Sequence, residues 1–180
     1  MKFEPAGLPG LWVIEMPHHG DDRGCFTRVF CRQSFADAGI PFSPVQMSSS
    51  SNRSSATLRG LHWQDAPHRE TKLVQVTRGR IFDVAVDLRP ASPTHLCWFG
   101  LELDDRSHRA LLISPGFAHG YITLEDSTDV LYAMDESFVP ALGCGARWDD
   151  PAFRIDWPAL PRVISDRDRQ WPAYTVPATE

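Results

Sequence analysis

The middle of the chain is a series of short apolar runs separated by turn residues, and this spacing limits the fold more than any other feature. The stretch "TKLVQVTRGRIFDVAVDLRP" holds two runs rich in β-branched residues around "TRGR", and the second run alternates apolar with acidic or small residues. The runs "HLCWFGLELD", "RALLISPG" and "GYITLEDSTDVLYAMDESFVP" follow at similar spacing. Short, regularly spaced strands predict an all-β sandwich or jelly roll, and "TRGR" predicts a hairpin between its flanking strands.

Helical signals are sparse. The segment "CRQSFADAGI" predicts about two helical turns, with Ser34 as the N-cap and Gly39 at the end. Near the C-terminus, "SDRDRQWP" predicts a short helical turn capped by Ser165. The polar stretch "MSSSSNRSSA" is typical of a flexible loop. We therefore expect one jelly-roll domain over residues 1–180, with an N-terminal strand segment and a short C-terminal helical segment.

Composition excludes several classes of partner. Apolar residues make up 42% of the 180 residues and charged residues 23%, which is typical of a globular domain. A net charge of -5 and a pI near 5.8 provide no basic surface for nucleic acid or an anionic membrane. No apolar run approaches the length of a membrane span, and no signal-peptide pattern is present. The four cysteines lack C-x-x-C spacing, so we expect reduced thiols and a cytoplasmic protein.

The stretch "TLRGLHWQ" sets three polar side chains within an otherwise buried strand pattern. Arg59, His62 and Gln64 each need a polar partner if they are buried. Either the protein supplies these partners, or the side chains face a ligand. For His62 alone, a hydrogen-bonded core histidine is the simpler interpretation.

Several motifs in a fixed order favour a functional role for His62 over a structural one. The segments "DDRGCF", "LRGLHWQ", "TKLV", "RIFDVAVDLRPASPT", "SPGFAHGY", "VLY", "RWDDPAFRIDWP" and "SDRD" run from about residue 10 to about residue 170. In order and spacing the chain resembles the dTDP-4-dehydrorhamnose 3,5-epimerases. The resemblance implies a cupin-type jelly roll and a homodimer without metal or other cofactor. It also implies epimerisation of a nucleotide-diphospho-4-keto-6-deoxyhexose, at C3 and C5 or at C3 only.

The chemistry of such a reaction can be matched to four residues. Inversion next to a ketone needs a base, a donor that stabilises the enolate oxygen, and an acid on the opposite face. His62 suits the base, because an imidazole pKa of about 6.5 leaves it substantially neutral, and Asp168 can hold its tautomer. The resemblance implies that Lys72 stabilises the enolate and that Tyr132 is the acid. Their joint presence favours catalysis over a structural role.

Substrate-binding positions are also implied by the resemblance: Arg23, Arg28, Gln46, Arg59, Gln64, His119, Phe138 and Arg167. Arg59 can bind a diphosphate through its forked donors. The nucleotide end departs from the family pattern, since Arg28 replaces a glutamate and Gly143 replaces another. Because arginine only donates hydrogen bonds and glutamate only accepts them, the carrier is left open among thymidine, cytidine, guanosine and uridine diphosphates.

Two other classes of function remain as alternatives. The altered nucleotide positions suit a non-catalytic jelly roll that binds a sugar nucleotide. A metal-dependent cupin would use His62, Gln64 and Glu70 together with His119. Glutamine is a poor replacement for an imidazole ligand, so we expect no metal.

Overall fold

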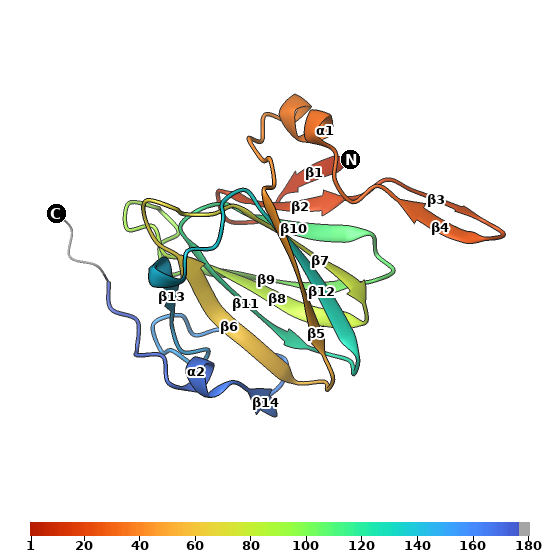
Figure 1. Cartoon of the computed structure of the whole chain (residues 1–180). Helices are drawn as coiled ribbons and strands as arrows, with labels where there is room; N and C mark the ends of the chain where they lie inside the picture. The colour runs from red at the N-terminus through yellow and green to blue at the C-terminus, as the bar shows by residue number, and fades with distance from the viewer. Residues whose placement is uncertain (177–180) are drawn as a thin grey trace.

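The computed structural model describes residues 1–176, and most of its regular structure is β-sheet (Figure 1). The strands are β1 (Lys2–Pro5), β2 (Leu11–Glu15), β3 (His18–Asp21), β4 (Gly24–Thr27), β5 (Gln46–Asn52), β6 (Thr57–Gln64), β7 (Lys72–Arg78), β8 (Arg80–Asp87), β9 (Trp98–Asp104), β10 (Arg109–Ile113), β11 (Phe117–Thr123), β12 (Thr128–Met134), β13 (Gly143–Gly145) and β14 (Val163–Ile164). The helical elements are α1 (Arg32–Asp37), the 3₁₀ turn η1 (Pro140–Leu142) and α2 (Asp166–Arg169).

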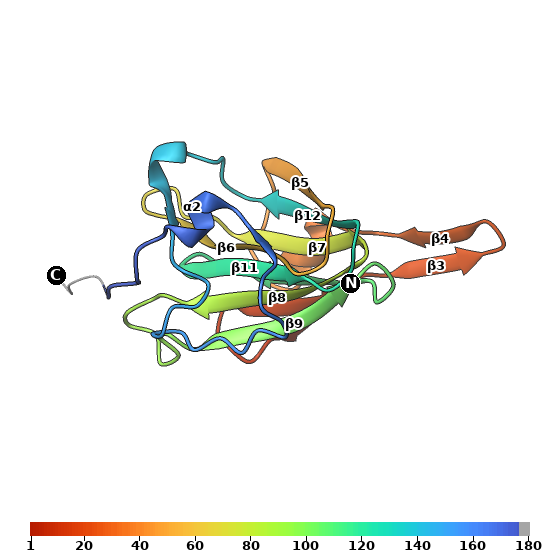
Figure 2. The ribbon, with the colours of Figure 1, turned by 90° about the horizontal axis from the view of Figure 1, so that it is seen from below.

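Two six-stranded sheets form the body of the molecule. One has the order β1-β2-β10-β7-β12-β5; the other has β13-β6-β11-β8-β9, with β14 beside β6. Figure 2 shows them as two layers, with β5, β12 and β7 in one and β11, β8 and β9 in the other. The predicted all-β sandwich or jelly roll is confirmed.

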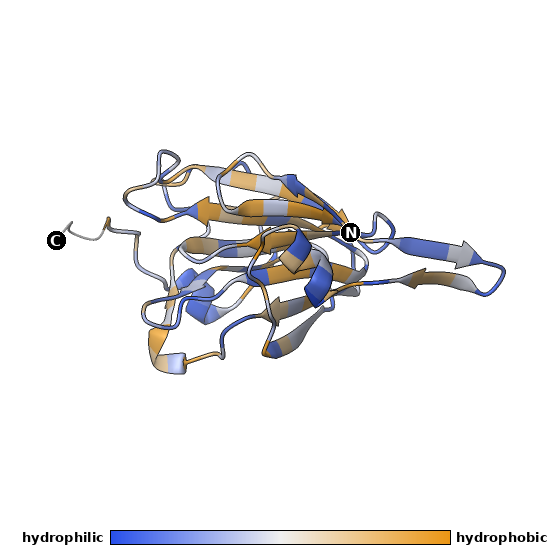
Figure 3. Cartoon of the chain, turned by 90° about the horizontal axis from the view of Figure 1, so that it is seen from above, coloured by the Kyte–Doolittle hydropathy of each residue, from blue (hydrophilic) through white to orange (hydrophobic). Residues whose placement is uncertain are grey.

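The core lies between the sheets. Its central cluster joins Leu11, Val74 and Val130 from the first sheet to Ile81 and Leu103 from the second. Burying each such side chain contributes about 1.5–3 kcal/mol. Figure 3 shows apolar residues concentrated along the strands, whereas the tip of the β3–β4 hairpin is hydrophilic. The sandwich is therefore stabilised by the apolar side chains that the strands direct into the space between the two sheets.

Strand β8 has apolar residues on both faces because the second sheet is covered twice. Ile81 and Ala85 belong to the core between the sheets. Val84 and Val86 pack in a separate cluster with Phe153, on the segment that follows β13. By alternation, the acidic residues of β8 share the inner face with Ile81 and Ala85.

The prediction of a hairpin at "TRGR" is wrong. Strand β7 pairs with β10 and β12, whereas β8 pairs with β9 and β11, so the two strands belong to different sheets. The turn between them, at Gly79, takes a φ of 78°. A tight turn between two apolar runs has the same local signal whether the chain pairs back on itself or crosses between sheets. Because the chain crosses here, β7 and β8, which are consecutive in sequence, lie on opposite walls of the sandwich.

The prediction of a flexible loop for "MSSSSNRSSA" is also wrong. Most of this stretch lies in β5, which pairs with β12 from Gln46 opposite Met134 to Asn52 opposite Thr128. Serine has low strand propensity, but backbone hydrogen bonds to β12 do not depend on the side chain. The small polar side chains leave β5 as a polar edge beside the site described below.

The short helices match the sequence in part. Helix α1 has Cys31 as its N-cap, so Ser34 lies inside the helix and its predicted capping role is wrong. Gly39 follows the C-cap with a φ of 69°, which confirms the predicted end. Ser165 caps α2 as predicted, accepting a hydrogen bond from the Asp168 backbone N–H at 3.1 Å. This cap fixes the turn that carries the Asp168 carboxylate.

Three further features concern the surface. The β3–β4 hairpin, which the sequence did not predict, projects away from the sandwich (Figure 1). The four cysteines are free thiols, as their spacing predicted. None of the helices in residues 1–176 is long and apolar enough to cross a membrane.

The buried Asp87 carboxylate stabilises the end of β8, and its loss should be measurable. Its oxygens accept hydrogen bonds from Arg89 (Nε, 2.8 Å), Ser92 (Oγ, 2.6 Å) and Thr94 (Oγ1, 2.7 Å). We expect Asp87→Asn to lower the free energy of unfolding in urea by about 3 kcal/mol, because these donors lose a charged acceptor. The matched control is Asp37→Asn on exposed α1, which should change little.

The acid dependence of stability provides a second measurement. Burial alone would raise the pKa of Asp87, but the hydrogen bonds from Arg89, Ser92 and Thr94 outweigh burial and hold the pKa well below its usual range. The stabilisation is therefore present above the unfolded-state pKa of about 3.9, and is lost as the pH falls toward the folded-state value. The Asp87→Asn protein should lack this part of the acid dependence. An unchanged curve would contradict the assignment.

Candidate active site

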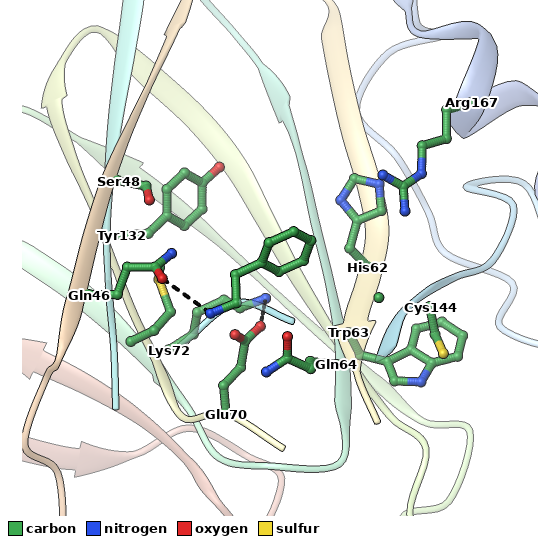
Figure 4. Close-up of a pocket in the computed structure, with 13 residues that line it drawn as sticks. Gln46, Ser48, His62, Trp63, Gln64, Glu70, Lys72, Tyr132, Cys144 and Arg167 are labelled. Atoms are coloured by element: carbon green, nitrogen blue, oxygen red, sulfur yellow. Dashed lines mark hydrogen bonds and ion pairs between the residues drawn. The ribbon is translucent and has the colours of Figure 1, made fainter. Parts of the chain in front are cut away.

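Two adjoining cavities are lined from both sheets. The first, here called the Phe138 cavity, has a volume of about 380 Å³, and the second, the Arg59 cavity, about 280 Å³. Figure 4 shows Gln46, Ser48 and Tyr132 on one wall of the Phe138 cavity and His62 on the other. The residues that line both cavities are Ser48, His62, Lys72 and Tyr132.

His62 on β6 and Asp168 on α2 form a dyad beside the second sheet. His62 Nε2 lies 2.6 Å from Asp168 Oδ1. Burial alone would raise the pKa of Asp168, but its contacts with His62 and the Gly60 N–H outweigh burial and hold the pKa below its usual range. The carboxylate is therefore ionised near neutral pH and can only accept, so Nε2 carries the proton. The lone pair of the neutral ring is then on Nδ1.

Tyr132 faces the dyad from the opposite sheet. It lies on β12, whereas His62 lies on β6, and both line the two cavities. Burial raises the pKa of the Tyr132 phenol well above its usual value, and Tyr121 and Asp83 raise it further. The phenol therefore stays protonated near neutral pH and can act as a proton donor. A base and an acid thus face one space from opposite sides.

Lys72 begins β7 on the same sheet as Tyr132. Its Nζ lies 2.7 Å from Glu70 Oε1, and both side chains are largely buried, with exposed fractions of 14% and 11%. Figure 4 shows this pair joined by a dashed line, between Gln46 and Gln64. A paired ammonium there supplies a fixed positive charge.

A second carboxylate–imidazole pair lies deeper in the sandwich. His119 Nε2 is 2.7 Å from Asp83 Oδ1, and the Asp83 side chain is fully buried. The strand register sets His119 opposite His62 on neighbouring strands. Gly60 and Gly120 allow this approach, because a Cβ on Gly60 would lie only 2.5 Å from the Gly120 Cα.

Asn52 organises the polar wall of the Arg59 cavity. Its Oδ1 accepts from Arg59 Nε at 2.8 Å, and its Nδ2 donates to the Tyr121 hydroxyl at 3.1 Å. Ser50 is also within hydrogen-bond distance of that hydroxyl, at 3.0 Å. Arg59 is thus held in place through Nε, while the residue as a whole remains exposed.

The structure brings together most of the predicted site residues. Gln46, Gln64, Phe138 and Arg167 line the Phe138 cavity, while Arg59, His119 and Asp168 line the Arg59 cavity. Arg23 and Arg28 do not line either cavity. Arg23 lies at the tip of the β3–β4 hairpin, with its side chain 90% exposed and paired with Asp21.

Comparison with known proteins identifies the family. The family model for dTDP-4-dehydrorhamnose 3,5-epimerase matches residues 5–175. The dTDP-4-dehydrorhamnose 3,5-epimerase of Methanothermobacter thermautotrophicus is 40% identical over 174 residues, covering 94% of this chain and 92% of the relative. The chain belongs to the dTDP-4-dehydrorhamnose 3,5-epimerase family.

Two further relatives show the range within the family. A crystal structure of the Bacillus anthracis dTDP-4-dehydrorhamnose 3,5-epimerase with TDP and pyrophosphate bound superposes with a TM-score of 0.93 and 39% identity, covering 96% of this chain and 99% of that chain. A dTDP-4-dehydrorhamnose 3-epimerase of Streptomyces niveus is 37% identical, covering 94% of this chain and 82% of the relative. The predicted family, cupin-type jelly roll and class of isomerase in deoxysugar biosynthesis are confirmed.

In this epimerase, the residues considered as a metal set each have a protein partner. Gln64 Oε1 accepts from the Val139 backbone N–H at 2.7 Å. Glu70 is paired with Lys72, and each of the two histidines has an aspartate partner. The glutamine makes a structural link where a metal-binding cupin places a ligand.

Sequence reasoning missed several residues of the epimerase site. Glu70 was considered only as a metal ligand, and Asp83 only as part of a strand alternation. Asn52 was assigned to a loop, so its contact with Arg59 could not be anticipated. The sequence did hold one signal for Asp83, because an acidic residue inside an apolar strand needs a partner. That signal could not name His119.

Proposed function

We propose that this chain epimerises a dTDP-linked 4-keto-6-deoxyhexose, at C3 or at C3 and C5, by removing an α-proton from one face and returning a proton from the other. One observation carries the proposal: the His62–Asp168 dyad and the Tyr132 phenol lie on opposite sheets and face a shared space. A carbon between them can lose and regain its proton on opposite faces, which inverts its configuration.

In this proposal His62 is the base. Asp168 accepts the Nε2 proton, so His62 Nδ1 takes the α-proton of the sugar. The ionised carboxylate also stabilises the imidazolium that forms. The neighbouring ketone makes the carbon acidic. A proton is removed from this carbon and another is returned to it, so no oxidation state changes.

The enolate oxygen needs positive charge or donors close to it. We assign this role to Lys72, whose ammonium lines both cavities. Tyr132 then returns a proton to the face opposite His62. Its raised pKa supports this role, because the phenol is protonated when the enolate is formed.

We assign Arg59 and Arg167 to the diphosphate. Both side chains are exposed at the cavities, and a guanidinium can bind two phosphate oxygens at once. TDP in the Bacillus anthracis relative supports thymidine as the carrier. The altered positions at the nucleotide end make the carrier the first property to test.

We also propose that the protein is a cytoplasmic homodimer. The free thiols support a reducing compartment. The exposed β3–β4 hairpin carries Arg23 and Phe26 away from the chain's own cavities, and Phe26 is 70% exposed. A partner subunit would cover this apolar side chain and give Arg23 an anion to bind. The mass from sedimentation equilibrium tests this assembly.

Solvent exchange tests the reaction directly. In heavy water, the wild-type protein should introduce deuterium at C3, or at C3 and C5, of a dTDP-4-keto-6-deoxyglucose substrate, as measured by NMR. Cytidine, guanosine and uridine carriers serve as matched substrates. No exchange with any of the four would overturn the proposal and favour a binding protein, for which stabilisation by ligand is the only expected effect. Loss of activity after chelation would instead favour a metal-dependent cupin.

A further inference from the structure

Two loops lie together along the Phe138 cavity. They are the β6–β7 loop (residues 65–71) and the β12–β13 loop (residues 135–142), here called the rim loops. At one end the Asp65 N–H donates to the Leu142 carbonyl at 3.0 Å. At the other end the Thr71 N–H donates to Asp135 Oδ1 at 2.6 Å. The rim loops are therefore joined at both ends.

Gln64 joins the same loops in the middle. Its Oε1 accepts from the Val139 N–H at 2.7 Å, and its Nε2 donates to the carbonyls of Ser137 at 3.1 Å and His68 at 2.5 Å. The residue is 4% exposed. Its amide has both ends engaged by the backbone, so little hydrogen-bonding capacity remains for a ligand.

Gln46 holds the next backbone amide from the other sheet. Its Oε1 accepts from the Phe138 N–H at 3.1 Å, which is drawn as a dashed line in Figure 4. Gln64 lies on β6 and Gln46 on β5, so two successive amides of the β12–β13 loop are fixed from opposite sheets. The part of this loop that carries Phe138 cannot move without breaking these bonds.

The Phe138 ring itself has little packing that could hold it. Its side chain is 51% exposed, and it lines the cavity with its ring close to the Gly143 backbone. A ring this exposed takes its position from the backbone beneath it. The two glutamines therefore determine how wide the Phe138 cavity is.

We propose that Gln64, assisted by Gln46, is a positioning residue that sets the Phe138 wall of the substrate pocket and so determines which substituents the epimerase accepts there. The proposal rests on the proposed function for its substrate. It replaces the direct substrate contact expected for Gln64, because the amide acts through Phe138. Both amides are uncharged, so the wall is fixed without adding charge beside the Lys72–Glu70 pair.

Hydrogen exchange and kinetics together test the proposal. Gln64→Met keeps the shape of the side chain and removes all three hydrogen bonds. Exchange of the Phe138 and Val139 amides should become about 10-fold faster or more. KM should rise about 10-fold while kcat changes less than about 3-fold, because binding alone is affected. Gln33→Met, the same change on exposed α1, should alter none of these.

A double-mutant cycle separates positioning from direct contact. In a Phe138→Ala background, Gln64→Met should change KM by less than about 2-fold, because the ring through which it acts is gone. Fully additive effects, or unchanged amide exchange in a folded Gln64→Met protein, would overturn the proposal. Gln46→Met loosens the Phe138 amide alone and keeps the test available if Gln64→Met does not fold. Failure of the proposed function would appear separately, as absent deuterium exchange in the wild-type protein.

Discussion

Replacing His62 with asparagine should abolish both deuterium incorporation and epimerisation. The asparagine amide can still donate to Asp168, so the local hydrogen bond has a substitute, but no lone pair of suitable basicity faces the cavity. We expect both rates to fall by at least about 10²–10⁴-fold, the usual contribution of a general base, because neither carbon can form its enolate without one. NMR in heavy water measures the two rates in the same sample.

The control for this variant is ligand binding. His62→Asn should retain thermal stabilisation by TDP, because Arg59 and Arg167 are untouched. Retained binding with no exchange would place the defect in proton removal rather than in the fold. Deuterium incorporation at close to the wild-type rate would contradict the assignment of His62 and direct attention to another base in the cavity.

The architecture and the dyad could be predicted from the sequence because their signals are local or belong to ordered motifs. Regular apolar runs indicated the strands, and the family resemblance carried by "LRGLHWQ" and "SDRD" implied the link between His62 and Asp168 across more than a hundred positions. The pairing of strands could not be predicted in the same way. A turn such as the one at Gly79 has one local signal for two topologies, and only packing across the sandwich decides between them.

The loop prediction for the serine-rich stretch was wrong for a related reason. Propensity describes how a side chain fits a strand, whereas β5 is specified by backbone pairing with β12. Its side chains are polar because they border the polar wall of the site, where Ser50 and Asn52 hold Tyr121. The sequence shows only low complexity there, whereas in the structure the same residues form an edge strand and a hydrogen-bonding surface.

The hydrogen-bond partners of the site residues could not be predicted from the sequence, for a third reason. Gln46 and Gln64, which were predicted to bind substrate, line the cavity, but their amides are bonded to the β12–β13 loop. A motif indicates that a glutamine is present, and only coordinates show which of its atoms remain free. Arg23 illustrates the opposite limit: it lies on the projecting β3–β4 hairpin and lines neither cavity, so one chain alone does not account for its predicted role.

Replacing Tyr132 with phenylalanine should separate the two protonation steps. The change removes the hydroxyl and keeps the ring, which packs near Tyr121 with ring centroids 6.4 Å apart. His62 remains able to form the enolate and to return a deuteron to the face it came from. We therefore expect substrate exchange to continue in heavy water while epimerisation falls by about 10²–10⁴-fold, the usual contribution of a general acid.

The comparison of exchange with inversion makes this prediction specific to Tyr132. Tyr174→Phe removes the same atom from a tyrosine that packs on Phe153 and Trp63 and lines neither cavity itself, and should leave the ratio of exchange to inversion unchanged. If Tyr132 instead formed part of the base, its loss would reduce exchange and inversion equally. If epimerisation continued at nearly the wild-type rate, the returning proton would have to come from water. Only exchange without inversion agrees with an acid on the first sheet facing a base on the second.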